Sequence, residues 1–406
     1  MPPVFNLSLL HMNPDLNRLQ PYPFQKLAAL FRDITPNPAY TPIRLSIGEP
    51  KHATPAFICD ALVGALDGLA SYPSTAGSDE LRATIATWVG QRYDLPPLNP
   101  KTQVLPINGS REALFAFAQT VLDRSRPDPV VVCPNPFYQI YEGAAFLGGA
   151  TPYFLNTLAE DNFALNFAQL PPEVWQRTQL IYVCSPGNPT GKVMSLAEWQ
   201  TLFELSDRYG FVIASDECYS EIYFDEKPLG GLQAARQLGR EDYRNLLMFS
   251  SLSKRSNVPG MRSGFVAGDA KLVEKFTLYR TYHGSAMSPS VQSASVAAWQ
   301  DEAHVAENRR LYAEKFARVV EILQPVLPVT LPDASFYLWI PTPISDTEFA
   351  QRLYRDYHVT VLPGSYLARE VRGVNAGANF VRLALVASTE ETVAGAQRIA
   401  EFVRGL

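Results

Sequence analysis

The feature that most constrains the fold is a regular alternation of short apolar runs with helical patterns between residues 105 and 268. We interpret five of these runs as buried strands: VVVC at 130–133, LIYVC at 180–184, FVIAS at 211–215, LLMFS at 246–250 and GFVAG at 264–268. Their almost continuous apolar character is typical of strands that are covered on both faces. Between them lie segments such as Glu112 to Asp123, where apolar residues recur at helical spacing. The alternation predicts an α/β fold with a mostly parallel sheet between layers of helices.

The pattern changes after residue 288. A long amphipathic stretch, roughly Ser290 to Leu323, leads into the apolar runs FYLWI, VTVL and NFVRLALV, with helical turns between them. We therefore expect a large domain over residues 49–290, followed by a long connecting helix and a smaller α+β domain over residues 291–406. Residues 1–48 are too few for a fold of their own, and we expect them to pack with the small domain. A chain of 406 residues suits two domains that share an interface.

Composition excludes several classes of protein. Hydrophobic residues make up 47% of the chain and charged residues 18%, which is the profile of an ordered protein with a large core. The formal net charge is -5 and there is no long run of Lys and Arg, so we expect neither nucleic acid nor a membrane as a partner. The sequence has no apolar run of membrane-spanning length and no secretory signal, so we expect a cytoplasmic protein. The His and Cys residues lack metal-binding spacing, so no metal is expected.

Chemically active residues cluster directly after the expected strands. The segments concerned are NGSRE at 108–112, NPFY at 135–138, SPGNPTGK at 185–192, SDECY at 215–219 and SSLSK at 250–254. In an open α/β sheet, ligands bind outside the carboxyl ends of the strands. The five segments together therefore predict one binding site at a single edge of the sheet.

Each segment allows a structural explanation beside the chemical one. The helix after NGSRE could bind a phosphate at its N-terminus, or Ser110 could simply cap that helix. Asp216 could cap a turn, or it could pair with a buried cationic ring nitrogen. Lys254 could extend its amine to solvent or form a Schiff base, and Arg262 beyond it could hold a phosphate. Prolines on both sides of Asn188 fix its position, as a ligand contact would require.

As a set, these motifs resemble those of the class I and II aminotransferases, which are pyridoxal 5'-phosphate (PLP) enzymes of fold type I. The features that carry the resemblance are SPGNPTG, an Asp and a Tyr three residues apart, and SxSK with an Arg eight residues after the lysine. The likeness runs from LSIGEP at 45–50 to FVRLALVAS at 380–388. It implies a large domain with a mostly parallel, seven-stranded type of sheet, a smaller α+β domain, and PLP as the cofactor.

The resemblance also implies a role for each matching residue around the cofactor. Lys254 would form the Schiff base with PLP and move the proton between substrate and cofactor. Asp216 would keep the ring nitrogen protonated, Asn188 and Tyr219 would bind the 3'-oxygen of the ring, and Tyr138 would stack on the ring. The phosphate ligands would be Ser110, Arg111, Ser251 and Arg262, with Ser253 as a weaker candidate. Tyr72 would reach the phosphate of the neighbouring subunit, which implies a homodimer with shared active sites.

For the substrate, the resemblance implies that Arg382 binds the α-carboxylate together with Asn188 and the backbone at Gly48. From the residues alone, Arg382 could equally be a surface residue of a strand. The segments LNRLQPYPFQKLAALF, RLSIGEPKHATP and NGSREALFAF are most similar to bacterial N-succinyldiaminopimelate aminotransferases. We therefore expect transamination between N-succinyl-LL-2,6-diaminopimelate and 2-oxoglutarate. The expected partners of its long anionic arm are Tyr22, Lys26, Arg280, His283 and Ser285.

Other activities stay open at this point. Aspartate, alanine and aromatic aminotransferases share the motifs, and a PLP-dependent C–S lyase would also keep the lysine, the aspartate and the arginine. A non-catalytic PLP-sensing domain of a transcription regulator would need a basic DNA-binding module before the core. The roughly fifty residues that precede the core here are not basic, which argues against that third class.

Overall fold

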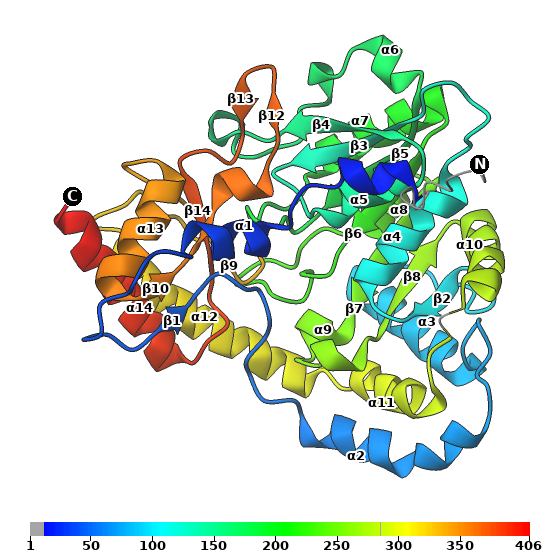
Figure 1. Cartoon of the computed structure of the whole chain (residues 1–406). Helices are drawn as coiled ribbons and strands as arrows, with labels where there is room; N and C mark the ends of the chain where they lie inside the picture. Colours follow the sequence, from blue (N-terminus) through cyan, green and yellow to red (C-terminus); the bar gives the residue numbers. More distant parts are fainter. Residues whose placement is uncertain (1–11, 285) are drawn as a thin grey trace, which may run out of the picture.

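A seven-stranded sheet forms the centre of the molecule (Figure 1). The structure is a computed structural model and describes residues 12–284 and 286–406. In spatial order the strands are β2 (Val104–Ile107), β8 (Gly264–Gly268), β7 (Leu246–Ser251), β6 (Val212–Asp216), β5 (Thr178–Cys184), β3 (Val130–Asn135) and β4 (Thr151–Asn156). Neighbouring strands are parallel except at β8, which is antiparallel to β2 and β7. The predicted mostly parallel sheet is confirmed.

Helices cover both faces of this sheet. On one face lie α4 (Ser110–Val121), α5 (Ile140–Leu147) and α10 (Ala270–His283). On the other face lie α3 (Asp79–Tyr93), α6 (Pro172–Trp175), α7 (Leu196–Tyr209), α8 (Gly231–Gln237) and α11 (Pro289–Gln300), with α2 (Ala56–Gly64) packed on α11. This double cover is the physical reason for the continuous apolar runs in the sequence.

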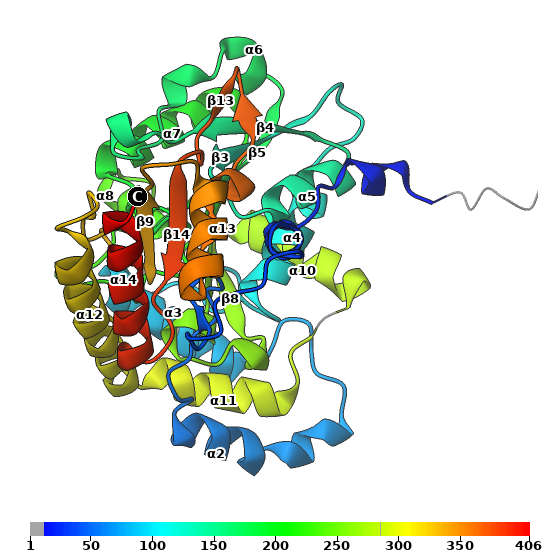
Figure 2. The same cartoon turned by 60° about the vertical axis from the view of Figure 1, so that its left-hand side comes forward.

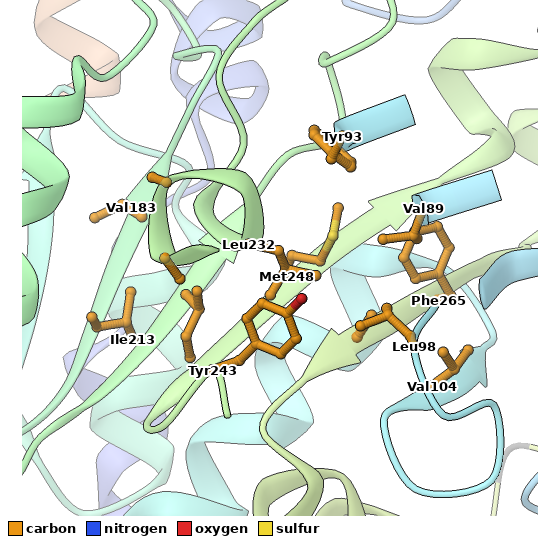
Figure 3. Packing of buried hydrophobic residues seen from close by; sticks show 14 of the residues in the cluster. Val89, Tyr93, Leu98, Val104, Val183, Ile213, Leu232, Tyr243, Met248 and Phe265 are labelled. Atoms are coloured by element: carbon orange, nitrogen blue, oxygen red, sulfur yellow. The ribbon is translucent and has the colours of Figure 1, made fainter. Parts of the chain in front are cut away.

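Alternation along the strands divides the buried side chains between the two faces. Val130 and Val132 pack against the α3 side, whereas Val131 and Cys133 pack against the α4 side. Figure 3 shows part of the α3 side, where residues from neighbouring strands of the sheet meet residues from α3 and α8. Those labelled there include Val183, Ile213, Met248 and Phe265 from the strands, and Val89, Tyr93 and Leu232 from the helices.

The C-terminal elements gather on one side of the molecule (Figure 2). A three-stranded antiparallel sheet contains β11 (Leu362–Pro363), β14 (Phe380–Ala384) and β9 (Tyr337–Pro341) in that order. It is joined by the hairpin of β12 (Glu370–Val371) and β13 (Val374–Asn375) and by the helices α12 (Ala303–Leu323), α13 (Asp346–Tyr357) and α14 (Thr389–Arg404). The three apolar runs after residue 323 all contribute strands, as the sequence predicted.

The stretch from residue 290 to 323 forms two helices, α11 and α12, rather than the single connecting helix that we predicted. The break falls at Asp301, whose backbone is extended (φ -104, ψ 126). Its carboxylate accepts a 3.0 Å hydrogen bond from the amide of His304. A side-chain bond of this kind satisfies a free amide at the start of a helix, so it favours a new helix over continuation of the old one.

The N-terminal segment contacts the C-terminal elements. Strand β1 (Ile43–Arg44) pairs in parallel with β10 (Val359–Thr360), and α1 (Pro23–Leu30) packs Leu27 against Leu362 and Leu367. On these contacts we propose to keep the division into residues 1–48, 49–290 and 291–406. Within the described residues, no helix combines the length and the apolar character needed to cross a membrane.

Candidate active site

The carboxyl ends of β5, β6 and β7 and the start of α4 border a cavity of about 400 Å³. Parallel strands present these ends at one edge of the sheet, which is why segments far apart in the sequence meet there. The predicted residues that line the cavity are Tyr22, Gly48, Ser110, Arg111, Tyr138, Asn188, Asp216, Tyr219, Ser251, Ser253, Lys254, Arg262 and Arg382. Almost the whole predicted site is therefore brought together by the fold.

Lys254 follows β7 in the short helix α9 (Leu252–Arg255) and extends its amine into the cavity. The Nζ atom donates a 3.1 Å hydrogen bond to the carbonyl oxygen of Gly48. Burial, together with the positive charges of Arg111, Arg262 and Arg382, lowers the pKa of the Lys254 amine to about 8. The lowered pKa makes the neutral, nucleophilic form of this amine accessible near neutral pH.

Asp216 is the last residue of β6 and is buried. Its Oδ2 accepts a 2.7 Å hydrogen bond from the hydroxyl of Tyr141, and its Oδ1 accepts a 3.3 Å bond from the amide of Cys218. Burial raises the pKa of the Asp216 carboxyl, and the two hydrogen bonds oppose that rise. The described residues provide no salt bridge to this carboxylate, so a cation in the cavity would supply the missing countercharge.

Arg382 lies in β14 on the opposite side of the cavity and is almost fully buried. Its guanidinium donates 2.8 Å hydrogen bonds to Oδ1 of Asn188 and to the carbonyl oxygen of Ser46, and it lies 4.3 Å from the ring centroid of Tyr337. Its Nε has no hydrogen-bond partner among the described residues. Buried, held in place and partly unsatisfied, Arg382 is suited to bind a carboxylate and is not the surface residue that the sequence left open.

A second group of cations lies at the start of α4. Arg262 donates hydrogen bonds to both carboxylate oxygens of Glu112 and to the carbonyl oxygen of Pro259. Gly109, the residue before the helix, has φ +90, and a Cβ there would collide with the Arg262 guanidinium. Arg111 donates to the hydroxyl of Tyr138. Free amides at a helix start and two guanidinium groups make this end of the cavity suitable for a phosphate.

Not every predicted residue lies at the cavity. Tyr72 is fully exposed and is not part of the lining. Three of the residues expected near the distal arm are also absent from the lining: Lys26 lies over the ring of Tyr366, Arg280 is buried and donates to Asn108, and His283 stacks on Tyr279. Ser285 falls outside the described residues.

The sequence reasoning missed several residues that lie at the site. Tyr337, Cys184 and Cys218 line the cavity. Tyr141 is not part of the lining but donates a hydrogen bond to Asp216. Tyr141 stands three residues after Tyr138 in NPFYQIY, so its place in that motif was the one available signal. Nothing in the local sequence around Tyr337 links it to the segments near residues 48 and 219 that it contacts.

The donor set fits PLP. A buried carboxylate without a salt bridge among the described residues suits a pyridinium nitrogen, an amine with a lowered pKa suits a carbonyl carbon, and the cationic end of the cavity suits a phosphate. Arg382 is left for the carboxylate of an amino acid. Together the fold and the site define an enzyme that performs carbonyl chemistry on amino acids.

Comparison with known proteins identifies the family. The family model for aminotransferase class I and II matches residues 40–399. The LL-diaminopimelate aminotransferase of Aquifex aeolicus is 32% identical over 364 residues, which cover 88% of this chain and 90% of that protein. The solved aminotransferase of Neisseria meningitidis is 54% identical, has a TM-score of 0.95, and the match covers 97% of this chain and 100% of that one.

A further solved structure, described as a probable N-succinyldiaminopimelate aminotransferase of Thermus thermophilus, is 25% identical with a TM-score of 0.83, and the match covers 93% of this chain and 99% of that one. The chain belongs to the class I and II aminotransferases. It is accordingly a PLP-dependent enzyme that transfers amino groups between amino acids and 2-oxo acids, with the fold of PLP fold type I.

Proposed function

We propose that this aminotransferase transfers the amino group of N-succinyl-LL-2,6-diaminopimelate to 2-oxoglutarate in lysine and diaminopimelate biosynthesis. The observation that carries the proposal of transamination at this cavity is that Lys254, Asp216 and Arg382 line it together. The choice of donor rests on the likeness of the N-terminal segments to bacterial N-succinyldiaminopimelate aminotransferases and on the Thermus thermophilus neighbour.

Different residues around the cavity would bind different parts of the cofactor. When bound, PLP supplies the carbonyl group that exchanges with the amino group and a ring that accepts electrons from the substrate. Asp216 would hold a proton at the ring nitrogen, because its carboxylate is buried and has no salt bridge among the described residues. Tyr219 and Asn188 would bind the 3'-oxygen, and Tyr138 would stack on the ring. The phosphate would be held by Ser110, Arg111, Ser251 and Arg262, with Ser253 as a weaker candidate.

Lys254 accepts and donates the proton that moves during transamination. Its amine has a pKa lowered to about 8 by burial, so the neutral form is accessible near neutral pH and can accept a proton from the α-carbon of the substrate. With PLP bound, it would then return that proton to C4′ of the cofactor. The carbonyl of Gly48, 3.1 Å from Nζ, orients the amine toward the cavity. Asp216→Asn should keep PLP bound but lose several orders of magnitude in turnover, because the neutral amide no longer holds the ring proton.

Arg382 binds the α-carboxylate of the substrate, with Asn188 fixing the guanidinium and the Gly48 backbone beside it. The distal arm extends toward Tyr22, which lines the cavity. Because Lys26 and Arg280 do not line it, Tyr22 is the stronger candidate for that contact within one subunit. A partner subunit would add Tyr72 to the phosphate site of a homodimer. Val63, Leu66 and Leu69, which precede Tyr72 closely in the sequence, are also exposed apolar residues, and this supports an interface there.

Free LL-diaminopimelate is the second candidate donor, favoured by curated relatives that carry that name, such as the Aquifex aeolicus protein. The experiment compares kcat/KM for both donors with 2-oxoglutarate, following glutamate formation, with alanine, aspartate and phenylalanine as short donors. We expect the succinylated donor to be preferred at least tenfold. A preference for the free diamine would establish the second candidate. Release of pyruvate and ammonia from a sulfur amino acid without any 2-oxo acid would indicate a C–S lyase.

A further inference from the structure

Tyr337, the first residue of β9, connects three parts of the site. Its side chain is buried and lines the cavity. Its hydroxyl oxygen lies 3.1 Å from the hydroxyl oxygen of Tyr219, and its ring lies under the guanidinium of Arg382 at 4.3 Å. On the Gly48 side the packing is so close that a Cβ at position 48 would collide with the Tyr337 hydroxyl.

The direction of the hydrogen bond between the two tyrosines follows from the bond that Tyr219 is proposed to donate to the cofactor. Burial raises the pKa of the Tyr219 hydroxyl well above its usual value, so the group stays a neutral phenol with one proton. If Tyr219 donates that proton to the 3'-oxygen of the cofactor, its oxygen is free only to accept. Tyr337 must then be the donor in the 3.1 Å bond.

We propose that Tyr337 is a positioning residue that donates a hydrogen bond to Tyr219 and thereby strengthens the bond from Tyr219 to the 3'-oxygen of PLP. The proposal rests on the proposed function of Tyr219. A phenol that accepts a hydrogen bond becomes a better donor, because successive hydrogen bonds polarise one another in a site of low dielectric constant. The bond also fixes the Tyr219 oxygen in one position, so that no reorientation is needed when the cofactor binds.

The Tyr337 ring has a separate contact. Its face lies against the Arg382 guanidinium, and this contact does not involve the hydroxyl. The two parts of the side chain can therefore be tested independently. Tyr337→Phe removes the hydroxyl and keeps the ring, whereas Tyr337→Leu removes both.

The test uses the holoenzyme. It measures the pH midpoint of the absorbance change of the bound cofactor, and this measurement does not require turnover. Weakening the hydrogen bond from Tyr219 to the 3'-oxygen should raise this pH midpoint. That bond stabilises the unprotonated form of the bound cofactor more than the protonated form, so its loss favours the protonated form. We expect Tyr337→Phe to raise it by about half a unit to one unit. Tyr219→Phe should raise it further, and adding Tyr337→Phe to Tyr219→Phe should change nothing more.

Tyr312→Phe is the matched control. Tyr312 belongs to the same apolar cluster as Tyr219, Phe336 and Tyr337, and its buried hydroxyl has no hydrogen-bond partner among the described residues. Its loss should leave the midpoint unchanged. In steady-state assays, Tyr337→Phe should keep the KM of the amino donor within about twofold. Tyr337→Leu should raise that KM severalfold, because Arg382 loses the ring beneath it.

The outcomes separate the inference from the function on which it rests. If Tyr219→Phe shifts the midpoint and Tyr337→Phe does not, Tyr337 has no part in tuning the cofactor and the inference is wrong. If neither variant shifts it, the proposed role of Tyr219 fails first. Equal shifts from Tyr337→Phe in the native and Tyr219→Phe backgrounds would mean that Tyr337 acts on the cofactor without Tyr219, which also overturns the inference.

Discussion

The hydroxyl of Tyr141 donates a 2.7 Å hydrogen bond to Oδ2 of Asp216, and both side chains are shielded from solvent. Tyr141 is held at this point by its ring, which stacks on the ring of Tyr182 with centroids 4.4 Å apart. Burial alone would favour the protonated form of Asp216, and a hydrogen bond to the ionised carboxylate opposes that effect. Tyr141 is therefore placed to keep Asp216 charged and to fix its orientation.

Tyr141→Phe should lower kcat by roughly one to two orders of magnitude, since a hydrogen bond to a charged group contributes about 1.5–3 kcal/mol. PLP should also dissociate more readily, because Asp216 pairs less strongly with the ring nitrogen. Both quantities can be measured by steady-state kinetics and by titration of the apoenzyme with PLP. Tyr182→Phe is the control, because it removes a hydroxyl from the adjacent stacked ring whose hydrogen bond goes to the Leu114 carbonyl. Equal losses in both variants would point to a general packing effect.

The contrast between Asp216 and Tyr141 illustrates what the sequence could predict. Asp216 follows an apolar strand directly, and strand ends meet at one edge, so its place at the site could be inferred from local pattern. The contact with Tyr141 joins residues 75 positions apart, and that of Tyr219 with Tyr337 joins residues 118 apart. Such contacts depend on how helices and the small domain pack, which a single sequence does not encode in any local motif.

Local departures from pattern explain why two strands and one helix break were not identified from the sequence. Strand β4 was not predicted because it lies at the edge of the sheet and is partly exposed, so its sequence TPYFLN lacks a continuous apolar run. Strand β2 was not predicted either, and it contains Pro106, which suits its position at the opposite edge. The break between α11 and α12 depends on the extended backbone at Asp301, which periodicity alone does not reveal.

Borohydride reduction of the holoenzyme, followed by peptide mapping, should find the pyridoxyl group on Lys254. The amine of Lys254 lies in the cavity with a lowered pKa, whereas Lys192, the other lysine in a motif, forms a 3.2 Å ion pair with Asp333. The purified protein should be yellow, and Lys254→Ala should show no measurable turnover. A label on Lys192 would contradict the assignment.

Mixing two impaired variants should test whether the sites are shared between subunits. Tyr72 is fully exposed in the single chain and so is free to reach a partner. A heterodimer of a Tyr72→Phe chain and a Lys254→Ala chain contains one site with both native residues if Tyr72 serves the other subunit. We expect that site to retain PLP more tightly than the sites of Tyr72→Phe homodimers and to recover turnover. Heterodimers that form without any such gain would exclude sharing through Tyr72.

Lys315 is a cation buried in α12, and its amine contacts a neutral base rather than an acid. Its side chain is 1% exposed, and Nζ lies 2.7 Å from Nε2 of His52, whose Nδ1 lies 2.7 Å from Oδ1 of Asn308. Burial lowers the pKa of the Lys315 amine to about 8 from 10.5. Between these values the unfolded chain binds more protons than the folded one, so this group makes the fold more stable as pH rises from about 8 to 10.5.

Below pH 8 the full cost of burying the charge remains, on the order of 2–3 kcal/mol. Lys315→Met keeps the length of the side chain and removes the charge, so it should increase the free energy of unfolding at pH 7 by about 1–3 kcal/mol, less the lost bond to His52. The gain should shrink as pH rises toward 10, where the native amine is already neutral in the fold. Urea unfolding at pH 7 and at pH 9.5 measures both effects, with the exposed Lys275→Met as the control that should change little. Destabilisation by Lys315→Met at pH 7 would mean that the bond to His52 contributes more than burial costs.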